Sequence, residues 1–408
     1  MSELSYLEKL LDGVKVEWKT LGKVLKRTKG TKITAGQMKA LHKDNAPLKI
    51  FAGGKTVAFV DFKDIPEKDI NREPSIIVKS RGIIEFEYYD KPFSHKNEMW
   101  SYHSNNDAIS IKYIYYFLKI NEGYFQKIGG KMQMPQIATP DTDKFEVPIP
   151  CPDNPEKSLA IQSEIVRILD KFTALTAELT AELNMRKKQY NYYRDQLLSF
   201  KEGEVEWKTL GEIGKWYGGG TPSKNKIEFW ENGSIPWISP KDMGRTLVDS
   251  SEDYITEEAV LQSSTKLIPA NSIAIVVRSS ILDKVLPSAL IKVPATLNQD
   301  MKAVIPHENI LVKYIYHMIG SRGSDILRAA KKTGGSVASI DSKKLFSFKI
   351  PVPNINEQQR IVEILDKFDT LTNSTTEGLP REIELRQKQY EYYRDLLFSF
   401  PKPETVSN

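Results

Sequence analysis

The sequence predicts a mixed α/β (α+β) protein in which two globular domains are separated by two long helices that form an antiparallel intramolecular coiled coil. Three observations support this fold class. The chain of 408 residues contains an internal duplication, both copies contain a long segment with heptad periodicity, and both contain a region of alternating strands and short helices. With 40% hydrophobic residues, the chain can bury a core in each of two or three domains.

The duplication is visible as three short stretches that return later in the chain in the same order. The pairs of matching ranges are 16–22 (VEWKTLG) with 205–211, 112–115 (KYIY) with 313–316, and 168–172 (ILDKF) with 364–368. Chance does not supply three such matches in one order. We therefore interpret the chain as two copies of one unit whose helices are similar and whose loops have diverged.

The repeat also continues across the ends of the chain. Residues 6–18 are similar to the run from Tyr193 to Trp207, so the N-terminus begins like the end of a long helix. This pattern makes the repeat circular and predicts a pseudo-two-fold body. We expect the N-terminal helix to dock where the C-terminal helix ends.

These patterns define five regions, in which X-Pro-X-Pro tracts at 147–150 and 350–353 close the two globules. The predicted regions are an N-terminal helix (1–15), a first globule (16–150), a central helix (151–203), a second globule (204–353), and a distal helix with its tail (354–408). The sheet order within each globule is left open by the sequence.

The two helical regions, 161–200 and 361–400, differ near their centres. The first contains a tandem Thr-Ala-Glu-Leu unit. Its candidate spacer residues are Thr176, Leu179, Thr180 and Leu183. The second contains Gly378 and Pro380, which should end or kink that helix and leave a partner in two pieces. The tandem unit could set a distance, or it could be a plain scaffold helix.

Composition excludes several classes of protein. No apolar run approaches the length of a membrane span, and no signal-peptide pattern opens the chain, so we expect a soluble cytoplasmic protein. Cys151 is the single cysteine, which excludes an internal disulfide and a cysteine-based zinc cluster. The net charge of +5 permits a nucleic-acid partner without demanding one.

Four groups of residues have the types that contact nucleic acid. The stretch 23–43 contains seven Lys or Arg and no Asp or Glu, interleaved with Gly and Thr, as expected for a loop that follows phosphates. Its candidates are Lys26, Arg27, Lys29 and Lys32, and Lys55 in the following Gly-Gly-Lys turn is added to them. A solvated basic face would explain the same charges.

In the second globule, the glycine-rich stretch 217–224 suggests backbone amides that approach an anion, although a simple glycine turn would look the same. Its candidates are Tyr217, Thr221, Ser223 and Lys224. Two further loops, 126–136 and 328–336, follow the matching helices and combine glycine with Lys, Gln, Thr or Ser. Their candidates are Lys131, Gln133, Gln136, Lys331, Lys332, Thr333 and Ser336.

Two turns that follow predicted strands complete the set, 79–81 and 278–280. Their candidates are Lys79, Arg81, Arg278 and Ser279. For any one of these residues a surface role unrelated to base reading is an equally good explanation.

We find no catalytic residues and no metal site in the sequence. A Walker loop is excluded because Lys49 occupies the position that requires glycine, and no glycine-rich cofactor motif opens a helix. The five histidines show no ligand spacing. The sequence therefore predicts a non-catalytic protein that binds no cofactor itself.

Taken together, the VEWKTLG stretches, the Pro-X-Pro closures and the helices ending in Tyr-Tyr-Arg-Asp resemble the DNA-specificity subunit of type I restriction-modification enzymes. The Thr-Ala-Glu-Leu tandem and the junction 199–207 are most similar to the type IC branch. The resemblance implies that each globule is a target recognition domain for one half of a split, asymmetric DNA site. It also implies that the helices set the spacer and bind two methyltransferase subunits.

The same resemblance implies partners and cofactors outside this chain, in a bacterial cytoplasm. S-adenosylmethionine would belong to the methyltransferase subunits, and ATP and Mg to restriction and translocase subunits. On this interpretation, one Thr-Ala-Glu-Leu unit lengthens the helix by about 6 Å, which matches one to two base pairs at about 3.4 Å each. The alternative function is a coiled-coil adaptor between proteins that has no DNA specificity.

Overall fold

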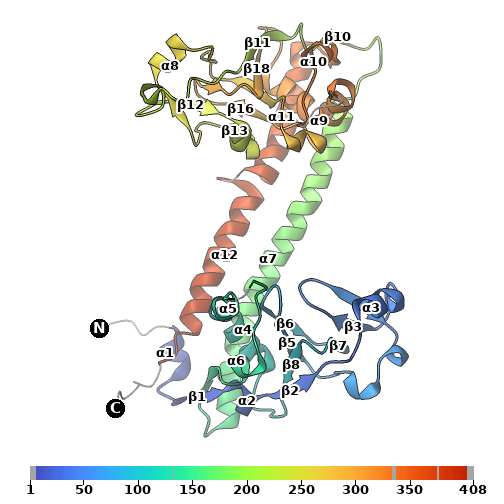
Figure 1. Cartoon of the computed structure of the whole chain (residues 1–408), viewed down its shortest axis with the longest axis vertical. Coiled ribbons are helices and arrows are strands. Elements are labelled where there is room, and N and C mark those ends of the chain that lie inside the picture. The colour runs from blue at the N-terminus through green and yellow to red at the C-terminus, as the bar shows by residue number, and fades with distance from the viewer. Residues whose placement is uncertain (1–5, 132, 333–336, 375, 402–408) are drawn as a thin grey trace. The chain divides into compact units, whose positions relative to one another are not determined.

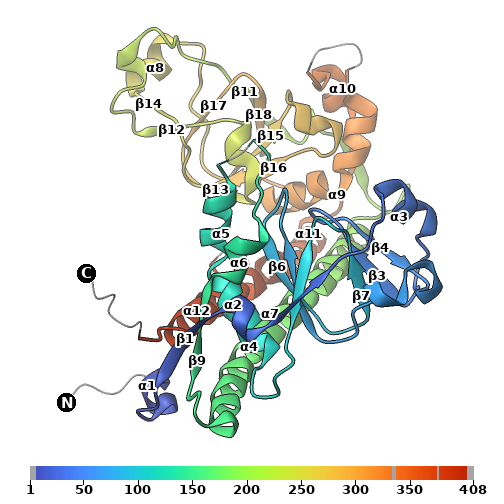
Figure 2. The ribbon, with the colours of Figure 1, turned by 60° about the horizontal axis from the view of Figure 1, so that its bottom comes forward.

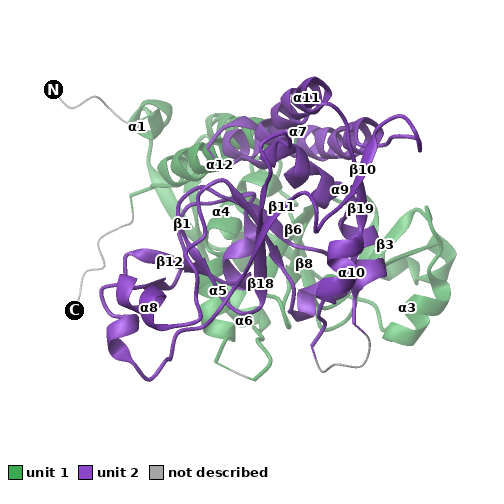
Figure 3. Cartoon of the chain, turned by 90° about the horizontal axis from the view of Figure 1, so that it is seen from above, with its two compact units in different colours: residues 1–178, 384–408 green, residues 179–383 purple. Residues whose placement is uncertain are grey.

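The computed structural model describes residues 6–131, 133–332, 337–374 and 376–401 (Figure 1). The chain divides into two compact units. Unit 1 comprises residues 1–178 and 384–408, and unit 2 comprises residues 179–383 (Figure 3). Each unit therefore contains one globule together with parts of the long helices. Within the described residues, no helix is long and apolar enough to cross a membrane.

Unit 1 contains three sheets. A four-stranded antiparallel sheet has the order β2-β8-β5-β6, a three-stranded sheet has the order β4-β3-β7, and β1 pairs with β9. The strands are β1 (Val16–Thr20), β2 (Lys26–Lys29), β3 (Leu48–Phe51), β4 (Val57–Val60), β5 (Ser75–Lys79), β6 (Glu85–Tyr89), β7 (Phe93–His95), β8 (Trp100–His103) and β9 (Glu146–Pro150).

Unit 1 contains several short helices, some of which contact the two larger sheets. They are α1 (Tyr6–Leu11), α2 (Leu21–Val24), α3 (Ala35–Leu41), α4 (Ile111–Ile120), α5 (Glu122–Gly129) and α6 (Thr139–Asp143), with 3-10 helices η1 (Phe62–Asp64) and η2 (Glu67–Asp69). Figure 2 shows α3 beside β3, β4 and β7, which together form a lobe of the first globule.

Unit 2 also contains three sheets, with the orders β11-β18-β15-β16-β13, β14-β12-β17 and β10-β19. The strands are β10 (Glu206–Thr209), β11 (Gly214–Gly218), β12 (Ile235–Ile238), β13 (Leu247–Val248), β14 (Tyr254–Ile255), β15 (Ser272–Val276), β16 (Ser288–Ile291), β17 (Thr296–Leu297), β18 (Met301–Pro306) and β19 (Lys349–Val352). Its helices are α8 (Glu257–Gln262), α9 (Val312–Ala330), α10 (Ser342–Ser347) and α11 (Ile355–Asn373), with η3 (Ile227–Phe229), η4 (Pro240–Gly244) and η5 (Ser280–Asp283).

The repeated VEWKTLG stretch has the same structural role in both units. It forms β1 or β10 and pairs antiparallel with the Pro-X-Pro strand that ends the globule, so that Trp18 faces Pro148 and Trp207 faces Pro351. Proline is tolerated here because each pair has only two strands, so one side of the proline strand carries no ladder bonds. Each globule is thus closed by its own first and last strands.

Matching contacts link the KYIY helix of each globule to a long helix and to the strand that ends the globule. In unit 1, Lys112 forms an ion pair with Asp170 (Nζ–Oδ2 2.7 Å), and Tyr113 donates to the Pro148 carbonyl (2.8 Å). In unit 2, Lys313 forms an ion pair with Asp366 (2.5 Å), and the Tyr314 hydroxyl donates to the Pro351 carbonyl (2.9 Å). The same chemistry at matched positions confirms the internal repeat.

The first long helix, α7 (Pro155–Leu197), is continuous over 43 residues, and both units include part of it. In unit 1, Phe172 stacks on Tyr393 of α12 (Gly378–Leu397), with ring centroids 5.4 Å apart. In unit 2, Tyr193 stacks on Phe368 of α11 at 5.7 Å. In each unit, a segment of α7 therefore pairs with a segment of the second helical region.

The second helical region is broken, as the sequence predicts. α11 ends at Asn373 and α12 begins at Gly378, which has φ +75°. A Cβ at Gly378 would lie 2.4 Å from the Thr370 carbonyl oxygen, so this turn requires glycine. Pro380 lies in the first turn of α12, where its missing N–H leaves no helical hydrogen bond unmade.

The N-terminal helix packs in the same core cluster as the end of α12. Leu7 and Leu11 of α1 share this cluster with Leu397 and Phe398, and all four are buried. The Tyr6 hydroxyl donates to Glu164 of α7 at 3.0 Å. The two ends of the repeat therefore meet in one core, as its circular pattern predicts.

Candidate nucleic-acid interface

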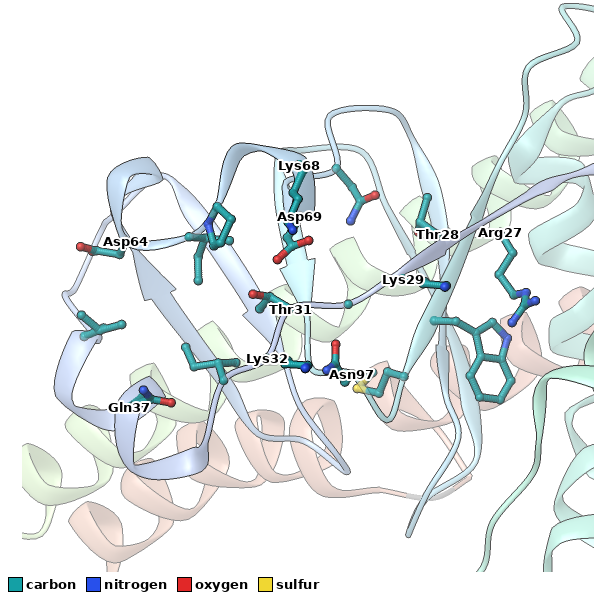
Figure 4. A pocket seen from close by; sticks show the side chains of 18 of the residues that line it. Arg27, Thr28, Lys29, Thr31, Lys32, Gln37, Asp64, Lys68, Asp69 and Asn97 are labelled. Atoms are coloured by element: carbon teal, nitrogen blue, oxygen red, sulfur yellow. The ribbon is translucent and has the colours of Figure 1, made fainter.

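A broad groove in the first globule contains three of the predicted DNA-binding residues. It measures about 1080 Å³ and lies between β2, the following loop, α3, the η1–η2 segment and the β7–β8 turn. Its polar and charged lining includes Arg27, Thr28, Lys29, Thr31, Lys32, Gln37, Asp64, Lys68, Asp69, Asn71 and Asn97. Figure 4 shows Gln37 and Arg27 at opposite ends, with Lys32 and Asn97 between them.

Local structure fixes the loop that forms one wall of this groove. A Cβ at Gly30 would lie 2.3 Å from the His95 carbonyl oxygen, so glycine allows the loop to approach β7. The Thr31 amide then donates to that same carbonyl (2.8 Å). Thr34 forms a capping box with Gln37, which starts α3 and places Gln37 on the groove.

The cations of the groove are largely available. Arg27, Lys29 and Lys32 are exposed, as is Lys26 outside the groove, and within the described residues neither Lys29 nor Lys32 forms an ion pair. Arg27 lies 3.5 Å from Asp143. Lys29, Lys32 and the exposed Lys68 therefore offer unneutralised ammonium groups in one concave surface, which is suited to a polyanion.

The groove also contains residues that sequence reasoning did not single out, among them four with amide or ammonium groups. Gln37, Lys68, Asn71 and Asn97 reach the groove from α3, η2, the segment before β5 and the β7–β8 turn. Asn97 is exposed and has no hydrogen-bond partner in the described part of the chain, and the buried Nδ2 of Asn71 also lacks one. No local motif signals these residues, because only the tertiary fold brings them together.

A second cluster joins two predicted turns of the first globule. Arg81 pairs with Gln136 in a β-bridge, and its guanidinium donates to Gln136 Oε1 (2.9 and 3.2 Å). Both side chains are exposed, as are Lys131 and Gln133 in the same loop. Lys55 is exposed in the separate turn between β3 and β4.

Lys79 is placed differently from its neighbours. It is buried on β5, and its ammonium contacts Glu85 (2.5 Å) and Glu87 (2.9 Å). Burial lowers the pKa of Lys79, but the hydrogen bonds to both carboxylates outweigh burial and raise that pKa overall. Its positive charge is therefore already satisfied within the globule, and we assign Lys79 a structural role rather than a phosphate contact.

The second globule has an equivalent arrangement of turn and loop. Arg278 forms a β-bridge with Ser339, and the Ser279 amide donates to the Ala338 carbonyl at 3.0 Å. Arg278 and Lys332 are exposed, whereas Lys331 forms an ion pair with Asp283 (2.5 Å). Thr333 and Ser336 lie outside the described residues.

The glycine stretch after β11 does not form the anion cradle that its sequence suggests. The Gly219 and Gly220 amides donate to the carbonyls of Met301 (3.1 Å) and Leu297 (2.8 Å), so they have no hydrogen left for an anion. A Cβ on Gly219 would lie 1.7 Å from the Asn298 carbonyl oxygen. These two glycines are required for close backbone packing.

The neighbouring side chains remain candidates. Ser223 and Lys224 are exposed, Thr221 and Tyr217 are half-buried, and the Thr221 hydroxyl donates to Gln299. Lys215 lies over the Tyr217 ring at 5.1 Å. This surface can donate hydrogen bonds from side chains, but not from the two glycine amides.

The spacer candidates lie in an unbroken part of α7. Leu179 and Leu183 are half-buried, Thr180 is exposed, and the Thr176 hydroxyl donates to the Phe172 carbonyl (2.9 Å). The tandem Thr-Ala-Glu-Leu units therefore add regular helix without a bulge or kink.

Comparison with known proteins identifies the family. The family model described as "Type I restriction modification DNA specificity domain" matches residues 14–186 and 202–385, one match for each repeat. The chain belongs to the type I restriction-modification DNA specificity family.

Named relatives agree. The chain is 73% identical over 413 residues to the Escherichia coli EcoR124I/EcoR124II specificity subunit, with 100% of both chains covered. It is 37% identical to the E. coli EcoprrI specificity subunit, covering 92% of this chain and 93% of that one.

Solved structures share the fold. A type I restriction-modification S subunit from M. genitalium has a TM-score of 0.61 at 18% identity, covering 96% of this chain and 98% of that one. A second structure, from work on assembly and conformational transition of a type I R-M system, has a TM-score of 0.56 at 14% identity, covering 94% and 97%.

Family membership confirms that this specificity subunit recognises DNA and is the non-catalytic, specificity-giving component of its system. It also goes against the adaptor alternative, because the matched model is a DNA specificity domain in both repeats.

Proposed function

We propose that the two globules of this specificity subunit read the two halves of a bipartite, asymmetric DNA site, one half each. The recognition domains are assigned to residues 16–150 and 204–353, and the segments 1–15, 151–203 and 354–408 form the helical scaffold. The observation that carries this proposal is that the matched helical contacts are repeated in both units, whereas the polar surfaces of the two globules differ.

In the first globule, DNA contacts come from the groove and from the neighbouring loops. Lys29, Lys32 and Lys68 contact phosphates, and Gln37 and Asn97 present amides that suit base edges. The remaining candidates of this globule are Lys26, Arg27, Lys55, Arg81, Lys131, Gln133 and Gln136.

In the second globule, contacts come from the turn and loop around Arg278 and from the side chains that follow β11. Arg278 and Lys332 are exposed cations, and Lys224 lies beside hydroxyl donors. The remaining candidates are Tyr217, Thr221, Ser223, Ser279, Lys331, Thr333 and Ser336. Different side chains in the two globules imply different half-sites.

The scaffold has two tasks in this proposal. The continuous helix α7, with Thr176, Leu179, Thr180 and Leu183 at its centre, sets the number of base pairs between the half-sites. The helices also bind two methyltransferase subunits, which contribute S-adenosylmethionine. Restriction and translocase subunits that use ATP and Mg join this complex in the bacterial cytoplasm.

Methylome sequencing tests the proposal. Cells that express this subunit with its methyltransferase should contain one methylated motif, made of two defined half-sites separated by a fixed number of unspecified base pairs. Cells with the methyltransferase alone are the control and should lack this motif. A continuous motif without a gap, or no motif that depends on the specificity subunit, would refute the assignment of one half-site to each globule.

A further inference from the structure

Unit 2 carries a row of aromatic rings that extends from the helix pair to the surface. Phe368 of α11 stacks on Tyr193 of α7, with an interplanar angle of 27°. Tyr193 in turn contacts Tyr192 edge-on, with ring centroids 5.4 Å apart. The inner ring contributes to helix packing, and the outer ring projects beyond it.

Unit 1 carries the same row in the same order. Phe172 of α7 stacks on Tyr393 of α12 at an angle of 26°, and Tyr393 contacts Tyr392 edge-on at 5.3 Å. We call Tyr192 and Tyr392 the outer tyrosines.

The outer tyrosines are not needed to build the helix pairs. Tyr192 is 62% exposed and Tyr392 is 65% exposed, and within the described residues neither hydroxyl forms a hydrogen bond. Large exposed aromatic rings are favoured at protein interfaces, where they bury a large area at low entropic cost.

The two copies of the repeat also differ beside these rings. Position 191 is Asn and position 391 is Glu, both exposed, so the surface next to the outer tyrosines has changed since the duplication. The tyrosines have not changed, although solvent exposure places no packing demand on them. A binding requirement present in both units explains why the tyrosines are the same in the two copies while the neighbouring position differs.

We propose that Tyr192 and Tyr392 are the anchor residues through which the specificity subunit binds its two methyltransferase subunits, one in each unit. This inference rests on the proposed function. The same small surface occurs twice on a chain whose DNA-reading globules differ, so the partner is one protein bound twice. Beside both outer tyrosines the same ion pair is repeated, Arg194 with Asp195 (3.2 Å) and Arg394 with Asp395 (2.7 Å).

The test uses the full chain with purified methyltransferase subunit. The variants are Tyr192→Ala, Tyr392→Ala and the double variant. The matched control is Tyr124→Ala, because Tyr124 is 53% exposed on α5 of the first globule. Native mass spectrometry gives the number of methyltransferase subunits bound, and titration gives each Kd.

Each single variant should weaken one of the two methyltransferase sites by about 30-fold or more, equivalent to about 2 kcal/mol. At concentrations where the wild type binds two methyltransferase subunits, single variants should bind one and the double variant none. The Tyr124→Ala control should bind two. Tyr→Phe at either position keeps the ring and should retain most of the affinity.

Folding and partner identity are checked separately. Thermal unfolding of the free variants should match the wild type, and Tyr192→Gln, which favours helix, should reproduce the loss seen with Tyr192→Ala. Single variants that bind two methyltransferase subunits with wild-type Kd, or an equal loss in Tyr124→Ala, would overturn the inference alone. A wild type that binds no methyltransferase would refute the proposed function itself.

Discussion

Replacing Lys29 and Lys32 by alanine should reduce the salt dependence of DNA binding by this specificity subunit. Both lysines line the groove of the first globule, and within the described residues neither forms an ion pair. Each is therefore free to neutralise one phosphate. Each phosphate neutralised contributes about 0.9 to the slope of log K against log salt concentration, so the double variant should lose about 1.8 from that slope.

This slope change has a measurable consequence. Between 50 and 200 mM salt, the affinity of the wild type should fall about tenfold more than that of the double variant. Fluorescence anisotropy with labelled duplex DNA, in the presence of the methyltransferase subunit, measures the slope. Each single variant should show about half of the effect.

A matched lysine supplies the control for this measurement. Lys43 lies in the same basic stretch, but its ammonium is 2.5 Å from Asp61 and its side chain is 55% exposed outside the groove. Lys43→Ala removes the same charge and should leave the slope unchanged. An unchanged slope in the double variant, or an equal decrease in Lys43→Ala, would show that the groove is not the phosphate-binding surface.

Three further outcomes follow from the first globule. Asn97→Ala should relax discrimination at one base pair of one half-site by about 1–3 kcal/mol, measured by binding to a substituted duplex library; Asn105→Ala, exposed outside the groove, should not. Lys79→Met should lower the free energy of unfolding by about 2–3 kcal/mol in urea titrations, because Glu85 and Glu87 lose their shared cation; unchanged stability would contradict the structural role. Burial lowers the pKa of His95 to about 4, so the folded protein keeps this imidazole neutral. The stability that depends on neutral His95 is complete above about pH 6.5, the ordinary pKa of histidine, and is lost as the pH falls toward 4. Thermal unfolding should show that the free energy of unfolding falls by about 2 kcal/mol by pH 5. His95→Gln should reduce this pH dependence, and an equally steep pH dependence in the variant would exclude His95 as its cause.

The helical scaffold was predictable from sequence because its signals are periodic and repeated. The heptad periodicity of both helical regions predicted that they pair, and Gly378 with Pro380 predicted the break between α11 and α12. These features depend on local spacing and on backbone conformation, which short stretches of sequence record directly.

The groove was only partly predictable. Lys29 and Lys32 lie in one basic stretch, whereas Lys68 and Asn97 come from segments that are distant in sequence and that only the tertiary fold brings to the groove. The burial of Lys79 could not be predicted from sequence either. Lys79 looked like a surface cation until β6 placed two carboxylates beside it.

The glycines after β11 show a different limit of prediction from sequence. In sequence, Gly219 and Gly220 fit an anion-binding loop, because glycine there would free backbone amides. In the structure, the Met301 and Leu297 carbonyls accept those amides, and Asn298 leaves no room for a Cβ. A glycine needed for close packing and a glycine needed for ligand access give the same sequence pattern.

We propose that the globules recognise the bases of the half-sites while α7 sets the gap between them. Deleting residues 176–179, one Thr-Ala-Glu-Leu unit, shortens α7 by about 6 Å and removes no residue of either globule. Methylome sequencing of cells that express this variant with the methyltransferase should show both original half-sites with a gap shorter by one to two base pairs, at about 3.4 Å each. Altered half-sites with an unchanged gap would contradict the account.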